Sequence, residues 1–254
     1  MNHLNTPSPN QIVEVVNPSS TSGVVLVCEH ASPHIPDAFA QLGLQDEILR
    51  SHVVWDPGAM GLARPLADDL NAALVAARIS RLVYDCNRPP DAPDAMPSRS
   101  EVFDIPGNTN LLAEQKAQRI ATYYIPFHSQ LSQVIGVRQN PILVTIHSFT
   151  PVFHGQSRDV EIGVLHDTDS RLADTLMRTA DTQLPHDVQR NAPYGPEHGV
   201  THTLREHALP FGHLNVMLEV RNDLLSDPPA QAAMAKTLGP WISAAINLAK
   251  GDIC

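Results

Sequence analysis

Short apolar runs recur along the chain, each with the length of a buried β-strand. They cover residues 23–28, 82–84, 141–146 and 214–220, and a less clear run covers residues 160–166. Continuous runs of this length, rich in Val, Ile and Leu, are typical of strands that are buried on both faces of a parallel sheet. The pattern therefore predicts a sheet that is covered by helices on both sides.

Between these runs, apolar residues recur with the period of an α-helix. After Asp56-Pro57, which resembles an N-cap followed by a first helical turn, apolar residues recur at spacings of three and four from Ala59 to about Ala77. We expect further helices over residues 111–137, with a kink or break at Pro126, and over 170–180, 202–207 and 228–250. The alternation of strands and helices predicts a three-layer α/β sandwich.

One domain is expected, because no shift in composition marks a boundary. Residues 1–22 are polar and rich in Asn, Pro and Ser, which predicts a flexible N-terminal tail before a single catalytic α/β domain over residues 23–254. Neither a signal-peptide core nor an apolar run near the roughly 18 residues of a membrane span is present in the sequence. We therefore expect no membrane partner and a cytoplasmic location.

The charge of the chain limits its partners. Its 17 Lys and Arg residues and 27 Asp and Glu residues give a formal charge of −10, which disfavours nucleic acid. An anionic small-molecule substrate would need a locally positive pocket, for which the candidates are Arg81, Arg88, Arg99 and Arg221. The three cysteines lack CxxC spacing, which indicates neither a disulfide framework nor a cysteine zinc site, whereas the 13 histidines offer metal ligands.

Polar side chains follow or end the apolar runs. They are His30, Asn87 and Arg88, His147, and Glu219 with Arg221, and Asp56 stands at a neighbouring helix start. In open α/β sheets the carboxyl ends of the strands meet at the edge that binds ligands. Two imidazoles and a carboxylate are the protein ligands of an open zinc site, a further glutamate can act as general base, and arginine can hold a substrate carboxylate. The sequence thus predicts a metal-dependent catalytic site.

Simpler structural roles exist for some of these residues. Asp56 can be a plain helix cap, and Glu219 can be a buried strand residue that is paired with Arg221. Cys28, Cys86 and Tyr84 are expected to pack in the core. The long loop over residues 89–110 contains five prolines and is typical of a binding loop, with Ser98, Arg99 and Ser100 as its reactive members, while His202 and His207 are candidate substrate contacts.

Six segments carry a family resemblance. Cys-Glu-His-Ala-Ser, Trp-Asp-Pro-Gly-Ala, Ser-Arg-Leu-Val-Tyr-Asp-Cys-Asn-Arg-Pro-Pro, Thr-Ile-His-Ser-Phe, Asn-Ala-Pro-Tyr and Leu-Glu-Val-Arg-Asn-Asp-Leu, in this order, resemble the N-formylglutamate amidohydrolase family from Gly23 to about Asp227. More distantly, the order of these residues is similar to the zinc carboxypeptidase and aspartoacylase superfamily. The resemblance implies a zinc-exopeptidase-like fold, with a mixed, mostly parallel sheet, and hydrolysis of an N-acylated acidic amino acid.

The resemblance also implies roles for individual residues. His30 and His147 would bind one Zn²⁺ per chain, with Asp56 as the likeliest third ligand, and Glu219 would be the catalytic base. Asn87 and Arg88 would hold a substrate carboxylate. The carboxypeptidase pattern has its glutamate three residues after the first histidine, where this chain has Pro33, so Glu29 and Asp37 remain alternatives for the acidic ligand.

The leading expectation for function is hydrolysis of N-formyl-L-glutamate to formate and L-glutamate. The same residues would serve a deacylase of another N-acyl amino acid or a small peptide, and a cell-wall amidase is a further enzymatic alternative. A binding or regulatory protein that retains the fold without catalysis is the alternative from a different class. A panel of N-acyl amino acids separates these hypotheses.

Overall fold

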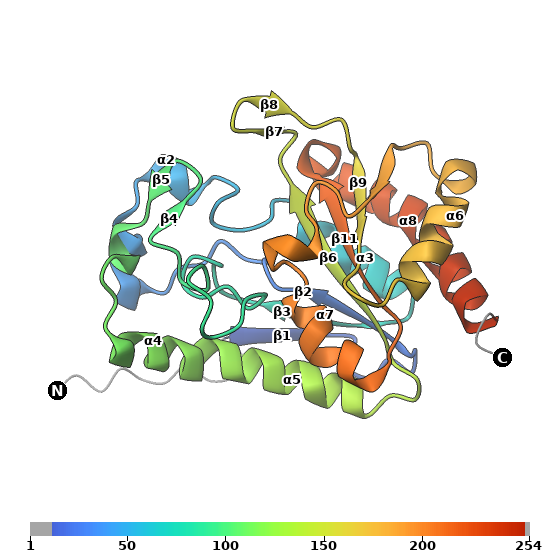
Figure 1. Ribbon diagram of the computed structural model, residues 1–254, viewed down its shortest axis with the longest axis horizontal. Helices are drawn as coiled ribbons and strands as arrows, with labels where there is room; N and C mark the ends of the chain where they lie inside the picture. The colour runs from blue at the N-terminus through green and yellow to red at the C-terminus, as the bar shows by residue number, and fades with distance from the viewer. Residues whose placement is uncertain (1–11, 252–254) are drawn as a thin grey trace.

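A mixed β-sheet forms the middle layer of the protein (Figure 1). The computed structural model describes residues 12–251, and within them seven strands pair into this sheet in the order β1-β3-β2-β6-β11-β9-β10. The strands are β1 (Val13–Val16), β2 (Val24–Cys28), β3 (Ala73–Ala77), β6 (Ile142–Phe149), β9 (Ile162–Leu165), β10 (Val188–Arg190) and β11 (Asn215–Arg221). The four central strands β3, β2, β6 and β11 are parallel, and β1 and β9 are antiparallel to their inner neighbours.

Helices cover both faces of the sheet. One face packs against α3 (Ala59–Asp69), α6 (Arg171–Gln183) and α8 (Pro228–Gly251), and the other packs against α5 (Ile125–Gly136) and α7 (His202–His207). Along β2, Leu26 belongs to the first hydrophobic cluster, whereas Val25 and Val27 belong to the second. Because alternate side chains of a strand point to opposite faces, both sets are buried. The expected three-layer α/β sandwich with a mixed, mostly parallel sheet is therefore confirmed.

Smaller elements lie outside the main sheet. They are α2 (Asp46–Leu49), α4 (Ala113–Arg119), the two-stranded hairpin of β4 (Arg99–Ser100) with β5 (Phe103–Asp104), and the hairpin of β7 (Val152–Phe153) with β8 (Gln156–Ser157). Both hairpins lie on the upper side of the view in Figure 1, at the end of the sheet where the central strands finish. They therefore stand beside the edge at which ligands are expected.

The predicted N-terminal tail is wrong for residues 13–16. This stretch is the edge strand β1, which pairs with β3 in antiparallel register, with Val13 opposite Ala77. Its alternation of Val and Glu suits a strand with one buried face, which the polar residues around it obscured. Residues 1–11 lie outside the described part. None of the helices within residues 12–251 is long and apolar enough to cross a membrane.

The predicted helix over residues 59–77 ends early. Helix α3 stops at Asp69, Asn71 takes a left-handed φ of 46°, and residues 73–77 form β3. A run of Ala, Leu and Val matches a helix or a buried strand equally well, so the turn decides where one ends and the other begins.

The third central strand is therefore β3, and the predicted strand over residues 82–84 is wrong. Leu82 and Val83 are buried in turns instead. The Ser80 carbonyl accepts a hydrogen bond from the Val83 N–H, and the Ser80 hydroxyl accepts one from the Leu82 N–H. Apolar packing without strand pairing explains their burial.

The predicted helix over residues 111–137 is present in three parts. Helix α4 continues into a π-helical segment, Ile120–Tyr124, and then into α5. Pro126 is the second residue of α5, directly after the wider π turns, where a proline without an N–H is tolerated. The chain consequently passes Pro126 without a break.

The periodicity predicts the other main elements correctly. They are strands β2, β6, β9 and β11 and helices α6, α7 and α8.

Candidate active site

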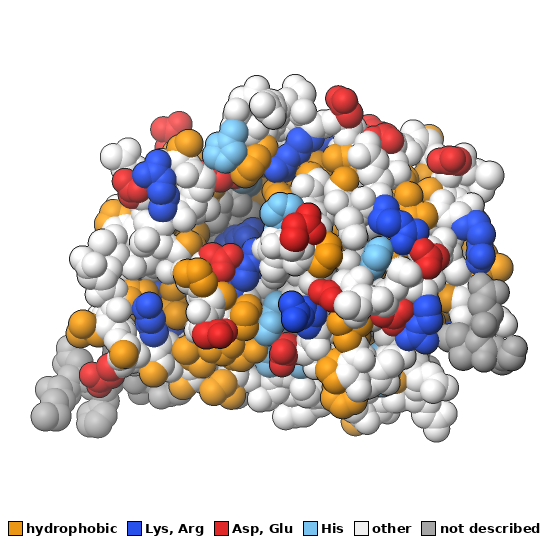
Figure 2. Space-filling model, viewed as in Figure 1, with side chains coloured by type: hydrophobic (Ala, Val, Ile, Leu, Met, Phe, Trp, Pro, Cys, Tyr) orange, Lys and Arg blue, Asp and Glu red, His pale blue; other side chains and the backbone are white. Residues whose placement is uncertain are grey.

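A cavity of about 600 Å³ lies at the carboxyl ends of the central strands. Its floor includes His30 after β2, His147 on β6 and Glu219 on β11, and its walls include Glu101 from the β4–β5 hairpin and Phe153 from β7. The space-filling view shows a hollow in the surface beside basic side chains (Figure 2). The size is within the range of small-molecule sites.

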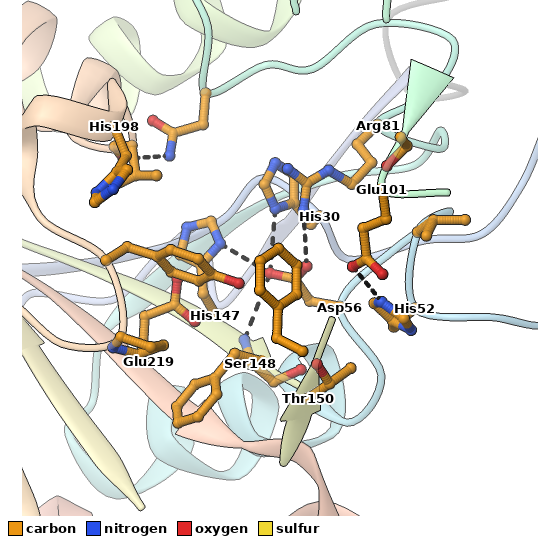
Figure 3. A pocket seen from close by; sticks show the side chains of 18 of the residues that line it. His30, His52, Asp56, Arg81, Glu101, His147, Ser148, Thr150, His198 and Glu219 are labelled. Carbon is orange, nitrogen blue, oxygen red and sulfur yellow. Dashed lines mark hydrogen bonds and ion pairs between the residues drawn. The ribbon is translucent and has the colours of Figure 1, made fainter. Parts of the chain in front are cut away.

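Three buried side chains converge on one point at the floor of this cavity (Figure 3). The His30 Nδ1 atom lies 3.1 Å from Asp56 Oδ2, and the His147 Nδ1 atom lies 2.9 Å from the same oxygen. The two imidazole rings meet edge to face with centroids 4.9 Å apart. The side chains therefore offer two ring nitrogens and a carboxylate oxygen to a single ion.

The backbone around Asp56 explains how it reaches the histidines. The Asp56 N–H donates a hydrogen bond of 3.0 Å to the carbonyl of His30. Gly58, rather than Asp56, is the N-cap of α3, with a φ of 83°, and a Cβ atom there would collide with Leu225. The Asp56 carboxylate is thus free of the capping role that its sequence position suggested, and it faces the histidines.

Each imidazole contacts one further carboxylate through its Nε2 atom. The His30 Nε2 atom lies 2.8 Å from Asp85 Oδ1, and the His147 Nε2 atom lies 3.0 Å from Glu29 Oε2. Metal-binding histidines in proteins characteristically make such a contact, which orients the ring and increases its basicity. Glu29, an alternative acidic ligand from the sequence, therefore lies behind His147. Asp37, the other alternative, is exposed and does not line the cavity.

The charges of the site suit a divalent cation. Burial raises the pKa of Glu29, Asp56 and Asp85, but His30 and His147 in their protonated form lower each pKa below its ordinary value, which favours the carboxylate form of all three. Arg81 is the cation that contacts two of them, with distances of 3.3 Å to Asp56 and 3.2 Å to Asp85. With neutral imidazoles, as metal ligation requires, two negative charges remain. The donor set of two nitrogens and one oxygen suits a divalent transition-metal ion.

Glu219 is the remaining buried acid of the site. It is the register partner of His147 in the adjacent strand, and it is only 4% exposed. Its Oε2 atom makes no hydrogen bond within residues 12–251. Burial raises its pKa to about 7, which is suited to taking and returning a proton near neutral pH.

Comparison with known proteins identifies the family. A family model for N-formylglutamate amidohydrolase matches residues 22–226. The chain belongs to this family. It is therefore a hydrolase that acts on an amide, in agreement with the enzymatic expectation and against the alternative of a non-catalytic binding protein.

Two solved structures are similar to this family member. The gene product Atu2144 from Agrobacterium tumefaciens shares 50% sequence identity, with a TM-score of 0.93 over 96% of this chain and 98% of the other. The N-formylglutamate amidohydrolase from Ralstonia eutropha JMP134 shares 17% identity, with a TM-score of 0.66 over 94% of this chain and 97% of the other, which supports the fold. The comparison with curated proteins gives no match.

In this amidohydrolase the predicted substrate-binding residues divide into two groups. Arg81, Asn87 and Arg88 line the cavity, whereas Arg99 and Arg221 do not. Arg99 is exposed and pairs with Asp104, 3.0 Å away. These two residues therefore lie outside the lining of the cavity.

Arg221 is also not the partner of Glu219. Its Nε atom donates to Asp223 at 2.8 Å, and its Nη1 atom donates to the carbonyls of Arg158 and Asp159. Glu219 and Arg221 are two positions apart and so point to the same face of β11, but Arg221 ends the strand and its guanidinium also contacts Glu161, 3.5 Å away. The structural role for Glu219 as an ion-pair partner of Arg221 is thus wrong.

Asn87 and Arg88 have protein partners as well as cavity positions. The Asn87 amide donates to the Val200 carbonyl at 2.6 Å, and its oxygen accepts the Thr203 N–H at 3.0 Å. Arg88 pairs through Nε with Asp94 at 2.6 Å and donates through Nη1 to two carbonyls. Both residues fasten the loop after β3 to the segment that precedes α7.

His202 and His207 do not line the cavity. They form a buried cluster with His128 and Tyr124, in which the His128 Nδ1 and His207 Nε2 atoms are 2.6 Å apart and the Tyr124 hydroxyl is 3.0 Å from His202 Nε2. The His128 and His207 rings stack with centroids 4.9 Å apart. Tyr124 of this cluster packs against the hydrophobic layer on the α5 face of the sheet, so these two candidate contacts lie outside the cavity lining.

Proposed function

We propose that this protein hydrolyses N-formyl-L-glutamate to formate and L-glutamate and that it uses Zn²⁺ for this reaction. The main observation in support is that Glu219 has a carboxylate oxygen without a hydrogen bond, and that it lies beside the converging His30, Asp56 and His147. His30, Asp56 and His147 would hold the ion, and Glu29 and Asp85 would orient the two imidazoles. Membership of the N-formylglutamate amidohydrolase family supports the substrate class.

The residues of the chain divide the chemistry between them. A bound divalent ion supplies Lewis-acid polarisation of an acyl carbonyl and makes water more acidic. Glu219 accepts a proton from the water whose oxygen forms the new bond to the formyl carbon. As the carbon–nitrogen bond breaks, the same carboxyl returns that proton to the departing amine nitrogen, which would otherwise be a poor leaving group. General acid–base catalysis of this kind is typically worth about 10² to 10⁴ in rate.

A substrate panel tests this proposal. Formate release from N-formyl-L-glutamate is measured with the metal-loaded enzyme, alongside release of acetate from N-acetyl-L-glutamate and of formate from N-formyl-L-leucine. We expect the highest kcat/KM with N-formyl-L-glutamate, and at least about a hundredfold lower kcat in Glu219→Gln with the metal content unchanged. Glu114→Gln, at an exposed position of α4, is the matched control. Failure of the wild-type enzyme to turn over any N-acyl amino acid would refute the proposal.

The size of the cavity supports a second candidate. At about 600 Å³ it lies within the range that holds drug-sized ligands, so a longer N-acyl group or a small peptide can also be accommodated. Preference for an N-acyl amino acid with a longer acyl chain in the same panel would favour this alternative.

A further inference from the structure

The cavity contains an arginine whose charge is not balanced by a protein acid. Arg81 contacts Asp56 and Asp85, and Arg88 pairs with Asp94. Arg158 also lines the cavity, yet within residues 12–251 no carboxylate oxygen lies within 4.0 Å of its guanidinium. Arg158 belongs to none of the strands or motifs that the sequence pattern predicts, so sequence reasoning did not single it out.

Aromatic rings hold the Arg158 guanidinium in place. Its Cζ atom lies 4.3 Å from the ring centroid of Phe153, 5.0 Å from that of Tyr194 and 5.6 Å from that of Phe149. The Tyr194 hydroxyl also accepts a hydrogen bond from Arg158, and the remaining N–H groups of the guanidinium fork can bind a carboxylate. One of these groups, at Nη1, makes a long hydrogen bond of 3.4 Å to the Thr150 carbonyl.

The backbone on both sides of Arg158 is also fixed. The turn of the β7–β8 hairpin has positive φ angles at His154 (48°) and Gly155 (77°), as a two-residue type I′ turn requires. Beyond the hairpin, the Arg158 N–H donates a hydrogen bond of 2.8 Å to the Pro151 carbonyl. The Arg158 carbonyl accepts one of 3.1 Å from Arg221. Arg158 thus extends from a closed hairpin toward the cavity that Phe149, Phe153 and Tyr194 share with it.

An anionic substrate needs such a group. The protein carries a formal charge of −10, and the cavity also contains Asp56, Glu101 and Glu219. A substrate carboxylate would be repelled by these acids unless a cation compensated for its charge. A guanidinium that is ordered by stacking before binding loses little side-chain entropy when it forms a bidentate pair with a carboxylate.

We propose that Arg158 is the residue that recognises a free carboxylate of the substrate and selects for it. This inference rests on the proposed function and deepens it, because it defines the substrates as N-acyl amino acids with a carboxylate within reach of the aromatic-lined wall. Arg158 selects the substrate, whereas Arg81 and Arg88 are engaged mainly with the protein carboxylates that they bind.

Paired acid and amide substrates test the proposal. The kcat/KM values of N-formyl-L-glutamate are compared with those of its α-amide and of N-formyl-L-glutamine, in wild type, Arg158→Met, Arg158→Lys and Arg171→Met. Arg171 lies outside the cavity at the start of α6, and it controls for loss of one positive charge. We expect wild type and Arg171→Met to prefer the acid over one of the amides by about 10- to 100-fold.

In Arg158→Met that preference should fall to nearly one, mainly through KM, and Arg158→Lys should restore only part of it. Loss of discrimination against the α-amide would identify the α-carboxylate as the group recognised, and loss against glutamine would identify the side-chain carboxylate. If Arg158→Met lowers kcat/KM equally for acids and amides, the arginine is structural and the proposal is wrong.

A binding measurement separates this inference from the proposed reaction. Glutarate, which has two carboxylates and no amide, should raise the Tm of wild type and Arg171→Met but not that of Arg158→Met at constant ionic strength. If no N-acyl amino acid is turned over and glutarate still protects in an Arg158-dependent manner, the proposed reaction fails and the carboxylate site stands. If glutarate protects wild type and Arg158→Met equally, the site assigned to Arg158 is refuted.

Discussion

Replacement of His207 by Gln should make the protein less sensitive to mild acid. The Ser132 hydroxyl lies 3.4 Å from His207 Nδ1, His207 Nε2 lies 2.6 Å from His128 Nδ1, and His128 Nε2 lies 2.9 Å from the Cys86 carbonyl. A carbonyl can only accept, so His128 donates through Nε2 and accepts at Nδ1 from His207. This series of hydrogen bonds is complete when both imidazoles are neutral, because a proton on His128 Nδ1 would face the N–H of His207.

The expected effect follows from the shifted pKa values. Burial, and then His128, lower the pKa of His207 to about 3 and that of His202 to about 4, and the two side chains are 7% and 6% exposed. The unfolded chain, with a histidine pKa of about 6.5, binds more protons below that pH, so the free energy of unfolding falls as the pH drops from about 6.5 toward the folded-state pKa. From about pH 7.5 to about pH 5, the loss at His207 is about 2 kcal/mol.

Urea unfolding of the metal-loaded protein across this pH range measures the effect. The free energy of unfolding of wild type minus that of His207→Gln should decrease by about 2 kcal/mol between about pH 7.5 and about pH 5, because only the wild type loses the His207 contribution. His34→Gln, at an exposed loop position, provides the baseline. If the difference in unfolding free energy between wild type and His207→Gln stays constant with pH, the inference that His207 and His128 are both neutral is wrong.

Three further predictions concern the residues at the floor of the cavity. His30→Ala and His147→Ala should each lose bound zinc, as measured by elemental analysis after dialysis, and full occupancy in both would contradict the assigned ligands. Asp85→Asn should weaken zinc affinity by about 10- to 100-fold in a chelator competition, because the His30 ring loses its orienting carboxylate, and an unchanged affinity would exclude that role. Glu219→Gln should bind zinc and glutarate normally while kcat falls by at least about a hundredfold, and near-normal turnover would remove Glu219 from the mechanism.

The sequence by itself indicated that His30, His147 and Glu219 lie at one edge of the sheet, and it left the acidic metal ligand open. His30 and His147 follow or end apolar strands, and Glu219 belongs to a third, so they share an edge whenever these strands run parallel. Local patterns suffice here because a parallel sheet brings equivalent strand ends together. The same patterns located most of the helices, since an amphipathic period is written into each segment separately.

Only the tertiary structure decided how polar groups pair around the floor of the cavity. Asp85 and Glu29 reach the far nitrogens of His30 and His147, and the cavity wall includes Arg158, 128 positions after His30 in an irregular segment. The identity of the third central strand was likewise set by a turn at Asn71. Such pairings depend on the paths of loops between strands, and those paths are fixed by long-range packing and by the need to satisfy buried charges, which no local periodicity records.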